Sequence, residues 1–203
     1  SKGKVAVDFM AQLEKRLDEI YRVHPEFQQG DQRICGTDVV GFETLLRRAA
    51  EYEQQLSAPF AVYIHGDFNV DNVIYDPIER RVNFIDLHRS CYGDYVQDVS
   101  VFMVSNYRLQ VIDPQKRRRM CLVAQRFHDT ADEYAVAAGD DSFELRLALG
   151  LARSFATSTR FTLDTSLARA MLLRSRFLLE RVLETDRKRA SAFRAPIREG
   201  FVG

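Results

Sequence analysis

One segment, residues 60–87, constrains the fold of this chain more than any other. The runs "FAVYIHGDF" and "VNFIDL" are short, apolar and rich in β-branched and aromatic residues, which is typical of buried β-strands. Between "NVIYD" and "RRVNFID" stands "DPIER", whose proline and charged residues favour a turn. The sequence therefore predicts a small β-hairpin after one further strand, with acidic side chains at the strand ends.

Helical periodicity dominates on both sides of this β-patch. Apolar residues recur at intervals of three and four, with charges on the opposite faces. Thr37 or Asp38 is expected to cap the second helix, and Asp113, Pro114 and Gly139 to delimit the fourth. Helices are predicted over residues 8–24, 38–56, 98–109, 114–138, 142–161 and 166–188. The expected fold class is mostly α with a small β-hairpin patch (α+β).

Composition excludes several classes of protein. The chain has 203 residues, of which 46% are hydrophobic, so it can bury a core as one domain or one lobe. Its 29 basic and 29 acidic residues cancel, which gives no reason to expect a nucleic acid or a membrane as partner. The basic run "QKRRRM" is interpreted as a solvated helix face. Three cysteines without a CxxC pair indicate reduced thiols and a cytoplasmic location.

Polar side chains at defined spacings interrupt the β-patch. Asp67 ends the triplet His65-Gly66-Asp67 after the first strand, Asn72 stands where the hairpin begins, and Asp86 ends the returning strand. Because a hairpin brings its two ends together, Asn72 and Asp86 should lie close in space. Two carboxylates and an amide oxygen make an oxygen-only site, which suits Mg²⁺ carried by phosphates rather than zinc or copper.

The motif "HGDFNVDN", followed by "FIDLHRS" and then "GDYVQDVS", resembles the catalytic core of the aminoglycoside phosphotransferase and choline kinase-like family, which shares the protein-kinase fold. The resemblance covers residues 60–105, and the flanking helices agree in kind with that family's C-terminal lobe. It implies an ATP-dependent phosphotransferase, with GTP as the other candidate nucleotide. Such an enzyme moves the γ-phosphate to a hydroxyl of a small molecule.

The resemblance also implies a role for each residue of the motif. Asp67 is expected to act as catalytic base or to orient the acceptor hydroxyl towards the γ-phosphorus. Asn72 and Asp86 are expected to hold Mg²⁺ on the nucleotide phosphates. His65 and Asp98 are expected to support the catalytic loop, with Asp98 also serving as the N-cap of the next helix.

The acceptor pocket is expected on the later helices, within residues 100–108 and 150–165. Candidate substrate-binding residues are His88, Arg89, Tyr107, Arg108, Arg153, Arg160 and Asp164. The arginines would better suit an anionic acceptor, and no dense acidic cluster indicates a polycationic antibiotic. Asp71 and Asp94 are interpreted as solvated loop residues, and Cys91 as incidental to the site.

A kinase-like enzyme also needs an N-terminal lobe, with a Gly-rich strand-turn-strand and a strand Lys paired with a helix Glu. Before residue 60 the sequence predicts two helices instead. We therefore expect residues 1–190 to form the catalytic C-terminal lobe, residues 191–203 a flexible tail, and the nucleotide lobe to lie outside this chain. The chain is then a fragment of a longer product, a natively short protein that needs a partner, or a domain of a multifunctional protein.

A kinase-like binding or regulatory module without catalysis is the alternative function. The intact set of Asp67, Asn72 and Asp86 counts against it. A strand Lys and a Gly-rich loop encoded before Ser1 would identify an enzyme, and their absence from the gene would favour the module.

Overall fold

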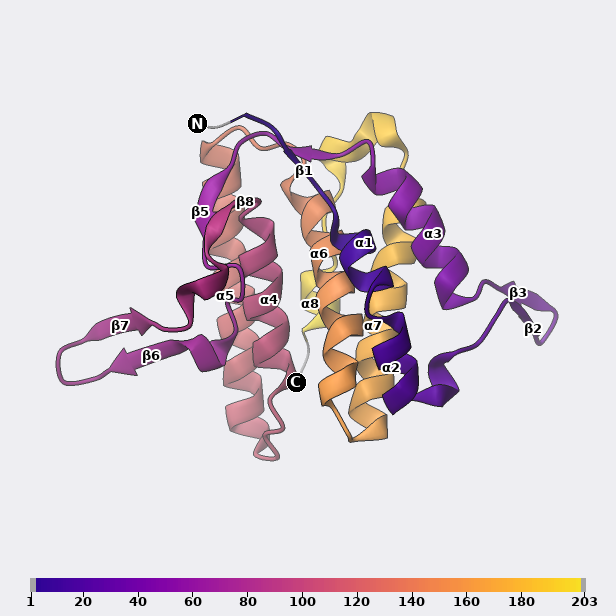
Figure 1. The fold of residues 1–203 in the computed structure, drawn as a ribbon, viewed down its shortest axis with the longest axis horizontal. Coiled ribbons are helices and arrows are strands. Elements are labelled where there is room, and N and C mark those ends of the chain that lie inside the picture. Colours follow the sequence, from indigo (N-terminus) through magenta and orange to yellow (C-terminus); the bar gives the residue numbers. More distant parts are fainter. Residues whose placement is uncertain (1–2, 202–203) are drawn as a thin grey trace.

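Most of the chain is helical in the computed structural model, which describes residues 3–201 (Figure 1). The α-helices are α1 (Phe9–Glu14), α2 (Leu17–Val23), α3 (Phe42–Glu53), α4 (Val96–Arg108), α5 (Pro114–Ala137), α6 (Phe143–Ser158), α7 (Thr165–Leu183) and α8 (Ile197–Gly200). Single 3₁₀ turns are η1 (Pro25–Phe27), η2 (Val70–Asn72), η3 (Leu87–Arg89) and η4 (Thr159–Phe161), and η5 (Arg187–Ala192) is longer. Within the described residues no helix is long and apolar enough to cross a membrane.

The strands form four separate antiparallel pairs. The strands are β1 (Val5–Ala6), β2 (Gln32–Ile34), β3 (Thr37–Val39), β4 (Ser57–Ala58), β5 (Val62–Ile64), β6 (Val73–Asp76), β7 (Arg81–Phe84) and β8 (Cys91–Gly93). β1 pairs with β4, β2 with β3, β5 with β8, and β6 with β7. The predicted class, mostly α with a small β-patch, is confirmed.

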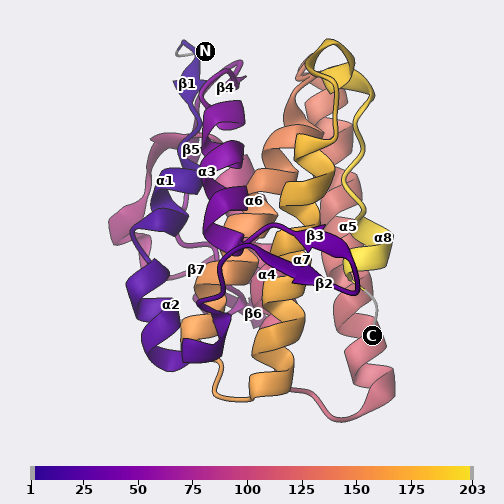
Figure 2. The ribbon, with the colours of Figure 1, turned by 90° about the vertical axis from the view of Figure 1, so that its right-hand side faces the viewer.

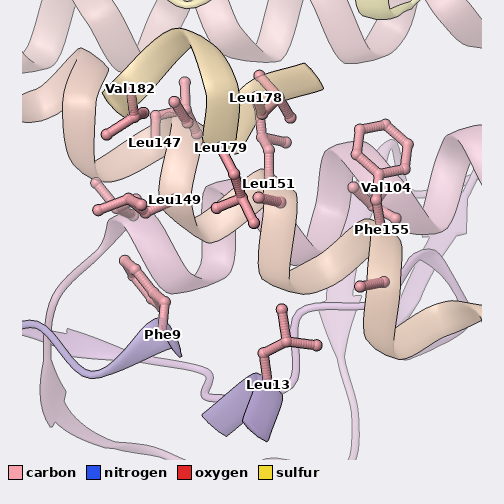
Figure 3. Packing of buried hydrophobic residues seen from close by; sticks show 14 of the residues in the cluster. Phe9, Leu13, Val104, Leu147, Leu149, Leu151, Phe155, Leu178, Leu179 and Val182 are labelled. Carbon is pink, nitrogen blue, oxygen red and sulfur yellow. The ribbon is translucent and has the colours of Figure 1, made fainter. Parts of the chain in front are cut away.

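Helix α6 forms the centre of the hydrophobic core. Nearly all of its residues between Phe143 and Ala156 are buried, as expected for a helix that is apolar around most of its circumference. It packs against α7, α4 and α1, and Figure 2 shows α6 and α7 side by side. In Figure 3, Leu147, Leu151 and Phe155 of α6 meet side chains from these neighbouring helices.

A fully buried arginine joins three segments inside this core. Arg146 of α6 forms ion pairs with Asp94 and Asp140, and its Nε donates to Ser142 Oγ at 3.1 Å. The Tyr95 hydroxyl donates to Asp140 at 2.7 Å. Burial disfavours the charge on Arg146, but the two carboxylates outweigh it and raise its pKa. The interpretation of Asp94 as a solvated loop residue is therefore wrong, because its carboxylate balances the buried cation.

The first two predicted helices differ from the observed ones. The helix expected over 8–24 is divided into α1 and α2, because the Arg16 N–H bonds the Leu13 carbonyl in a tight 3₁₀-type turn. The second helix starts later than expected. Thr37 and Asp38, the expected caps, instead lie in β3 and pair with β2, and Gly41 is the N-cap residue of α3.

The predicted hairpin is present, with β6 and β7 in register from Val73–Phe84 to Asp76–Arg81. It was expected to be buried, and this part of the prediction is wrong. β7 is exposed along its whole length, and the hairpin projects from the helical body (Figure 1). The residue types of a strand indicate that it can pair, whereas its burial depends on what packs over it. Phe84 at the base of the hairpin contacts Phe68, and β7 is otherwise left exposed. β8, which pairs with β5, was not predicted.

The chain after α7 returns to the core instead of forming the flexible tail expected over 191–203. Phe193, Ile197 and Phe201 are buried, and the Phe201 ring lies 5.6 Å from that of Phe155 between centroids. Arg174 Nε donates to the Gly200 carbonyl at 2.8 Å. The apolar residues spaced through this segment explain the docking, and the last two residues of the predicted tail lie outside the described ones.

Replacing Arg146 by alanine tests the buried ion pairs. Arg146→Ala leaves two carboxylates without their counter-charge, so the free energy of unfolding should fall by about 3–5 kcal/mol. Arg119→Ala, on the exposed side of α5, should change it by less than about 0.5 kcal/mol. Urea denaturation of both variants measures the difference, and equal stability of the two would contradict a central role for Arg146.

Glu53 provides a test of stability against pH. Its carboxylate is buried at the start of α1, where it accepts the Met10 N–H at 3.0 Å. Burial raises its pKa to about 7, although the N–H donors of Met10 and Phe9 act in the opposite direction. The folded chain thus keeps a proton that the unfolded chain has lost above pH 4.5. The stabilisation linked to this proton is present at low pH and lost as the pH rises through about 7.

Wild type should therefore lose stability relative to Glu53→Gln as the pH rises from 5 to 8. At about 1.4 kcal/mol for each unit of pKa difference, the part of the relative loss that falls between pH 5 and 8 should be roughly 2–3 kcal/mol. Glu133→Gln on the exposed face of α5 is the control and should show no such pH dependence. Urea denaturation at several pH values measures the free energy of unfolding of each variant. If this free energy changed with pH in the same way for wild type and Glu53→Gln, the raised pKa of Glu53 would be contradicted.

Candidate active site

A loop between β5 and η2 carries the predicted catalytic aspartate, and α4 fixes its start. The carboxylate of Asp98 accepts the N–H groups of His65 at 2.6 Å and Gly66 at 3.0 Å. Burial raises the pKa of Asp98 even though these donors oppose the shift. The sequence had suggested that Asp98 is the N-cap residue of this helix, and that prediction is wrong. It lies in the first turn of α4, and Asp94 accepts the Val96 N–H ahead of it.

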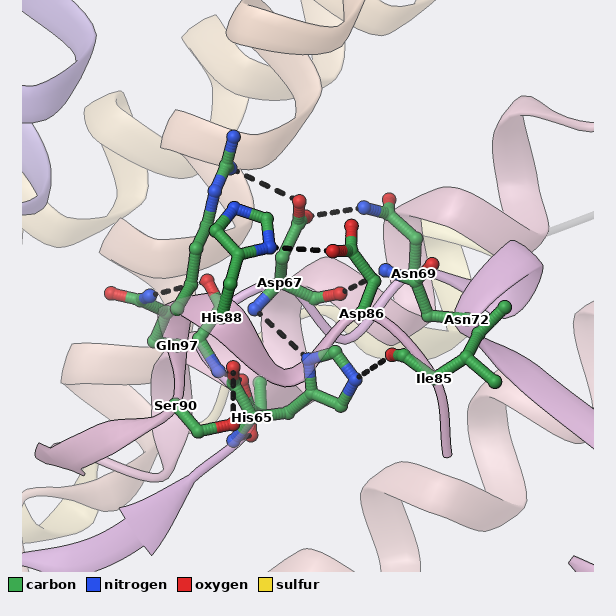
Figure 4. Close-up of polar contacts among 12 residues, drawn as sticks. His65, Asp67, Asn69, Asn72, Ile85, Asp86, His88, Ser90 and Gln97 are labelled. Carbon is green, nitrogen blue, oxygen red and sulfur yellow. Dashed lines mark hydrogen bonds and ion pairs between the residues drawn. The ribbon is translucent and has the colours of Figure 1, made fainter. Parts of the chain in front are cut away.

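His65 links this loop to the end of the hairpin. Its Nε2 lies 2.9 Å from the Ile85 carbonyl, and its Nδ1 lies 3.4 Å from the Asp67 backbone nitrogen (Figure 4). The carbonyl can only accept and the N–H can only donate, so these contacts select the tautomer protonated at Nε2. The side chain is nearly buried and its ring packs against Phe68. His65 thus lies under the loop that carries Asp67.

Gly66 lets the loop approach the segment after β7 closely. Its φ is +83°, and a Cβ placed on it would lie 2.3 Å from the Arg89 carbonyl oxygen. Gln97 Nε2 donates to the Gly66 carbonyl at 3.0 Å, and Ser90 Oγ donates to that of His65 at 3.2 Å. A side chain at position 66 would therefore meet both backbone strain and a clash.

Asp67 is held on both carboxylate oxygens. Asn69 Nδ2 donates to Oδ1 in a short hydrogen bond, and Arg89 Nη1 lies 3.0 Å from Oδ2. The side chain is partly exposed and borders a cavity. Sequence reasoning named Arg89 as a substrate candidate and missed Asn69. The position two residues after Asp67 was the available signal, because an asparagine there can bond the carboxylate locally.

The hairpin brings Asn72 and Asp86 together beside this loop. The Ile85 N–H donates to the Asn72 carbonyl at 3.1 Å, and Asn72 Nδ2 donates to the Asp67 carbonyl at 2.8 Å. Asp86 has a φ of +60°, and His88 Nδ1 lies 2.5 Å from its Oδ1. Figure 4 shows Asp67, Asn72 and Asp86 gathered in one place.

This donor set fits a metal ion that arrives with its own ligands. The Asn72 amide nitrogen is used in the hydrogen bond to the loop, so the amide oxygen remains available to a metal ion. The Asp86 side chain is half exposed. Among residues 3–201 there is no group of three or more His, Cys, Asp or Glu that could hold a metal ion. Two oxygens from the protein, with phosphates and water for the rest, match the way Mg²⁺ is bound at nucleotide sites.

A cavity of about 720 Å³ opens beside Asp67. Among the predicted acceptor residues, those that line it are Arg89, Arg108, Arg153 and Arg160. The lining residues Val101, Ser154, Thr157, Ser158 and Phe161 also lie within the predicted ranges 100–108 and 150–165, and Gly66 belongs to the predicted loop. The lining residues that sequence reasoning missed are Gln12, Lys15, Arg16, Asn69 and Gln97. Two of them, Lys15 and Arg16, come from the turn between α1 and α2, which the sequence had predicted to be continuous helix.

Three predicted substrate residues lie elsewhere. Tyr107 is buried, and its ring packs edge-on against Phe155, because it belongs to the inner face of α4. Asp164 caps α7 by accepting the Leu167 N–H at 2.9 Å. His88 is exposed beside Asp86 and does not line the cavity.

The profile of the phosphotransferase enzyme family (APH) matches residues 7–133, which is more than half of the chain. The chain therefore belongs to this family, and the resemblance seen in the motif is confirmed. Comparison with curated proteins and with solved structures gave no match. The matched region includes the catalytic loop, the hairpin and Asp98, and it ends within α5.

Comparing two glycines distinguishes the energetic cost of the clash at position 66 from the cost of backbone strain alone. Gly66 and Gly139 both have positive φ, but a Cβ on Gly139 would meet nothing within 4 Å. Gly139→Ala should cost about 1–2 kcal/mol of unfolding free energy from strain. Gly66→Ala should cost at least about 2 kcal/mol more, because the Arg89 backbone must move. Thermal unfolding of the pair measures this, and equal losses would contradict the close approach.

Proposed function

We propose that this chain is the catalytic lobe of a cytoplasmic small-molecule kinase that moves the γ-phosphate of ATP or GTP to a hydroxyl. The observation that supports this best is the position of Asp67. Its carboxylate borders the cavity, while Asn72 and Asp86, which lie beside it, do not line that cavity. An acceptor and a metal-bound nucleotide can then approach one carboxylate from two sides.

Asp67 is proposed to receive the acceptor hydroxyl and to aim it in line with the γ-phosphorus. Asn69 and Arg89 fix the carboxylate, and each of its oxygens keeps a second lone pair for the hydroxyl. In a loose transition state such positioning matters more than proton transfer. Asn72 and Asp86 would hold Mg²⁺, which offsets the negative charge of the phosphates.

We also propose that a nucleotide-covering lobe is needed beyond these residues. Among the described elements before residue 60 are three α-helices and short strand pairs, and none is a Gly-rich strand-turn-strand. Phosphates bound at Asn72 and Asp86 would then be open to water on their outer side, which weakens electrostatic stabilisation. Residues 1–203 alone should accordingly transfer phosphate poorly.

The test compares nucleotide binding with turnover in the complete gene product. Asp86→Ala should weaken Mg²⁺-dependent ATP binding at least about tenfold, because a direct metal ligand is lost. Asp67→Asn should keep that binding and lower turnover by about 10²–10⁴-fold. Glu133→Gln should alter neither. Calorimetry measures the binding, and release of ADP in the presence of candidate alcohols measures the turnover.

Each part of the proposal can fail separately. Unchanged ATP binding by Asp86→Ala would exclude the metal assignment. Binding without turnover of any hydroxyl compound, in wild type, would favour a regulatory module. Rapid ATP-dependent turnover by residues 1–203 alone would contradict the need for a further lobe.

A further inference from the structure

The cavity beside Asp67 collects positive charge in a chain whose formal net charge is zero. Four of its cations surround it away from the catalytic loop. Lys15 and Arg16 come from the turn between α1 and α2, Arg108 from the end of α4, and Arg160 from η4. Among the lining residues Asp67 is the only aspartate or glutamate. The charge is therefore a local arrangement and not a property of the whole chain.

One carboxylate outside the cavity forms ion pairs with two of these cations. Glu19 lies 2.6 Å from Arg16 Nη1 and 3.1 Å from Arg160 Nη1. Burial lowers the pKa of Arg160, Glu19 acts against this, and the neighbouring charges of Arg16 and Arg89 lower it further. The electrostatic repulsion between such neighbouring cations is offset when an anion binds between them.

The other two cations are matched more loosely. Arg108 Nη2 lies 3.8 Å from Asp71, whose side chain is mostly exposed, so solvent screens the pair. Lys15 is exposed and forms no ion pair within the part of the chain that the structure describes. The four cations thus face two carboxylates, which leaves an excess of two positive charges around the cavity.

The two remaining cations of the cavity are already occupied. Arg89 pairs with Asp67. Arg153 lies close to the carboxylates of Asp8, Asp67, Asp98 and Glu53, although burial lowers its pKa to about 10. The positive charges of these two arginines are balanced by carboxylates around the loop that carries Asp67. They therefore do not add to the excess of positive charge at the cavity.

An exposed aromatic ring orients two of the guanidinium groups at the cavity, those of Arg108 and Arg160. The Arg160 guanidinium carbon lies 4.5 Å from the centroid of Phe161, and that of Arg108 lies 5.9 Å from the same centroid. Stacking on one ring holds the planar groups in place, and the N–H donors that Glu19 and Asp71 do not occupy remain available to an oxyanion. Such pre-ordering lowers the entropy lost when a ligand binds.

We propose that this cavity binds an acceptor that carries an anionic group, a phosphate or a carboxylate, as well as the hydroxyl to be phosphorylated. Lys15, Arg16, Arg108 and Arg160 bind the anion while Asp67 receives the hydroxyl. This inference rests on the proposed function for the role of the hydroxyl. Arg160 and Phe161 lie beyond residue 133, outside the part of the chain that matches the family.

Calorimetry with the complete gene product in EDTA, without nucleotide, tests the anion site alone. The probes are glycerol 3-phosphate, glycerate, glycerol and choline, which share a hydroxyl and differ in charge. At least one of the two anions should bind about tenfold tighter than glycerol and choline. Which of the two binds more tightly identifies the anionic group as phosphate or carboxylate.

Variants then locate the binding. Lys15→Gln and Arg160→Gln should each weaken the preferred anion by about three- to tenfold. Lys15 is exposed and unpaired within residues 3–201, so its replacement should not disturb folding. Arg119→Gln on α5 is the matched surface control and should bind as wild type does. Equal binding of glycerol and both anions, or unchanged affinity in both cavity variants, would overturn the inference.

Asp86→Ala separates this inference from the proposed function. It should weaken Mg²⁺-dependent ATP binding at least about tenfold and leave the anion affinity within about twofold of wild type. If Asp86→Ala lost its affinity for the anion, the anion would bind at the nucleotide site, and the inference would be overturned. If the anions fail to bind while Asp86→Ala still loses ATP, the kinase proposal stands alone. If wild type binds the anion but not ATP, the anion site stands and the kinase proposal fails.

Discussion

The arrangement of the site depends on the buried charge of Arg146. Taking a guanidinium out of water is costly, and only good pairing offsets that cost. Arg146 is paired with Asp94, just before α4, and with Asp140, just before α6, so the starts of both helices are tied together. Asp98 follows in the first turn of α4, and its carboxylate holds the backbone at His65. A charge in the core therefore sets where the loop that carries Asp67 begins.

The catalytic loop divides two environments with different chemistry. On one side the hairpin supplies Asn72 and Asp86, neutral and acidic oxygen donors that suit a cation. On the other side lies the cavity, whose cations suit an anion. Asp67 lies between them. Under the proposed function, keeping opposite charges on opposite sides would let one carboxylate meet both a metal-bound nucleotide and an acceptor, which requires a firmly fixed loop.

The motif was readable in the sequence because a hairpin joins residues that are near in the chain. Asn72 and Asp86 were expected to be neighbours, and the pairing of β6 with β7 makes them so. The burial of that hairpin and the roles of Asp94 and Tyr107 were misjudged. Each depends on a partner far along the chain, such as Arg146 for Asp94, and neither periodicity nor composition identifies such a partner.

The sequence by itself determined the family, the hairpin between helical segments, and the ends of α5, where Asp113 caps the first turn and Gly139 follows the last. These features follow from hydrogen bonds and side-chain periods within a few residues. Only the tertiary structure decided that Lys15 and Arg160 meet at one cavity, and that Phe201 docks on the core. Such contacts are set by the packing of whole helices, because burial and charge balance depend on all the surfaces that meet.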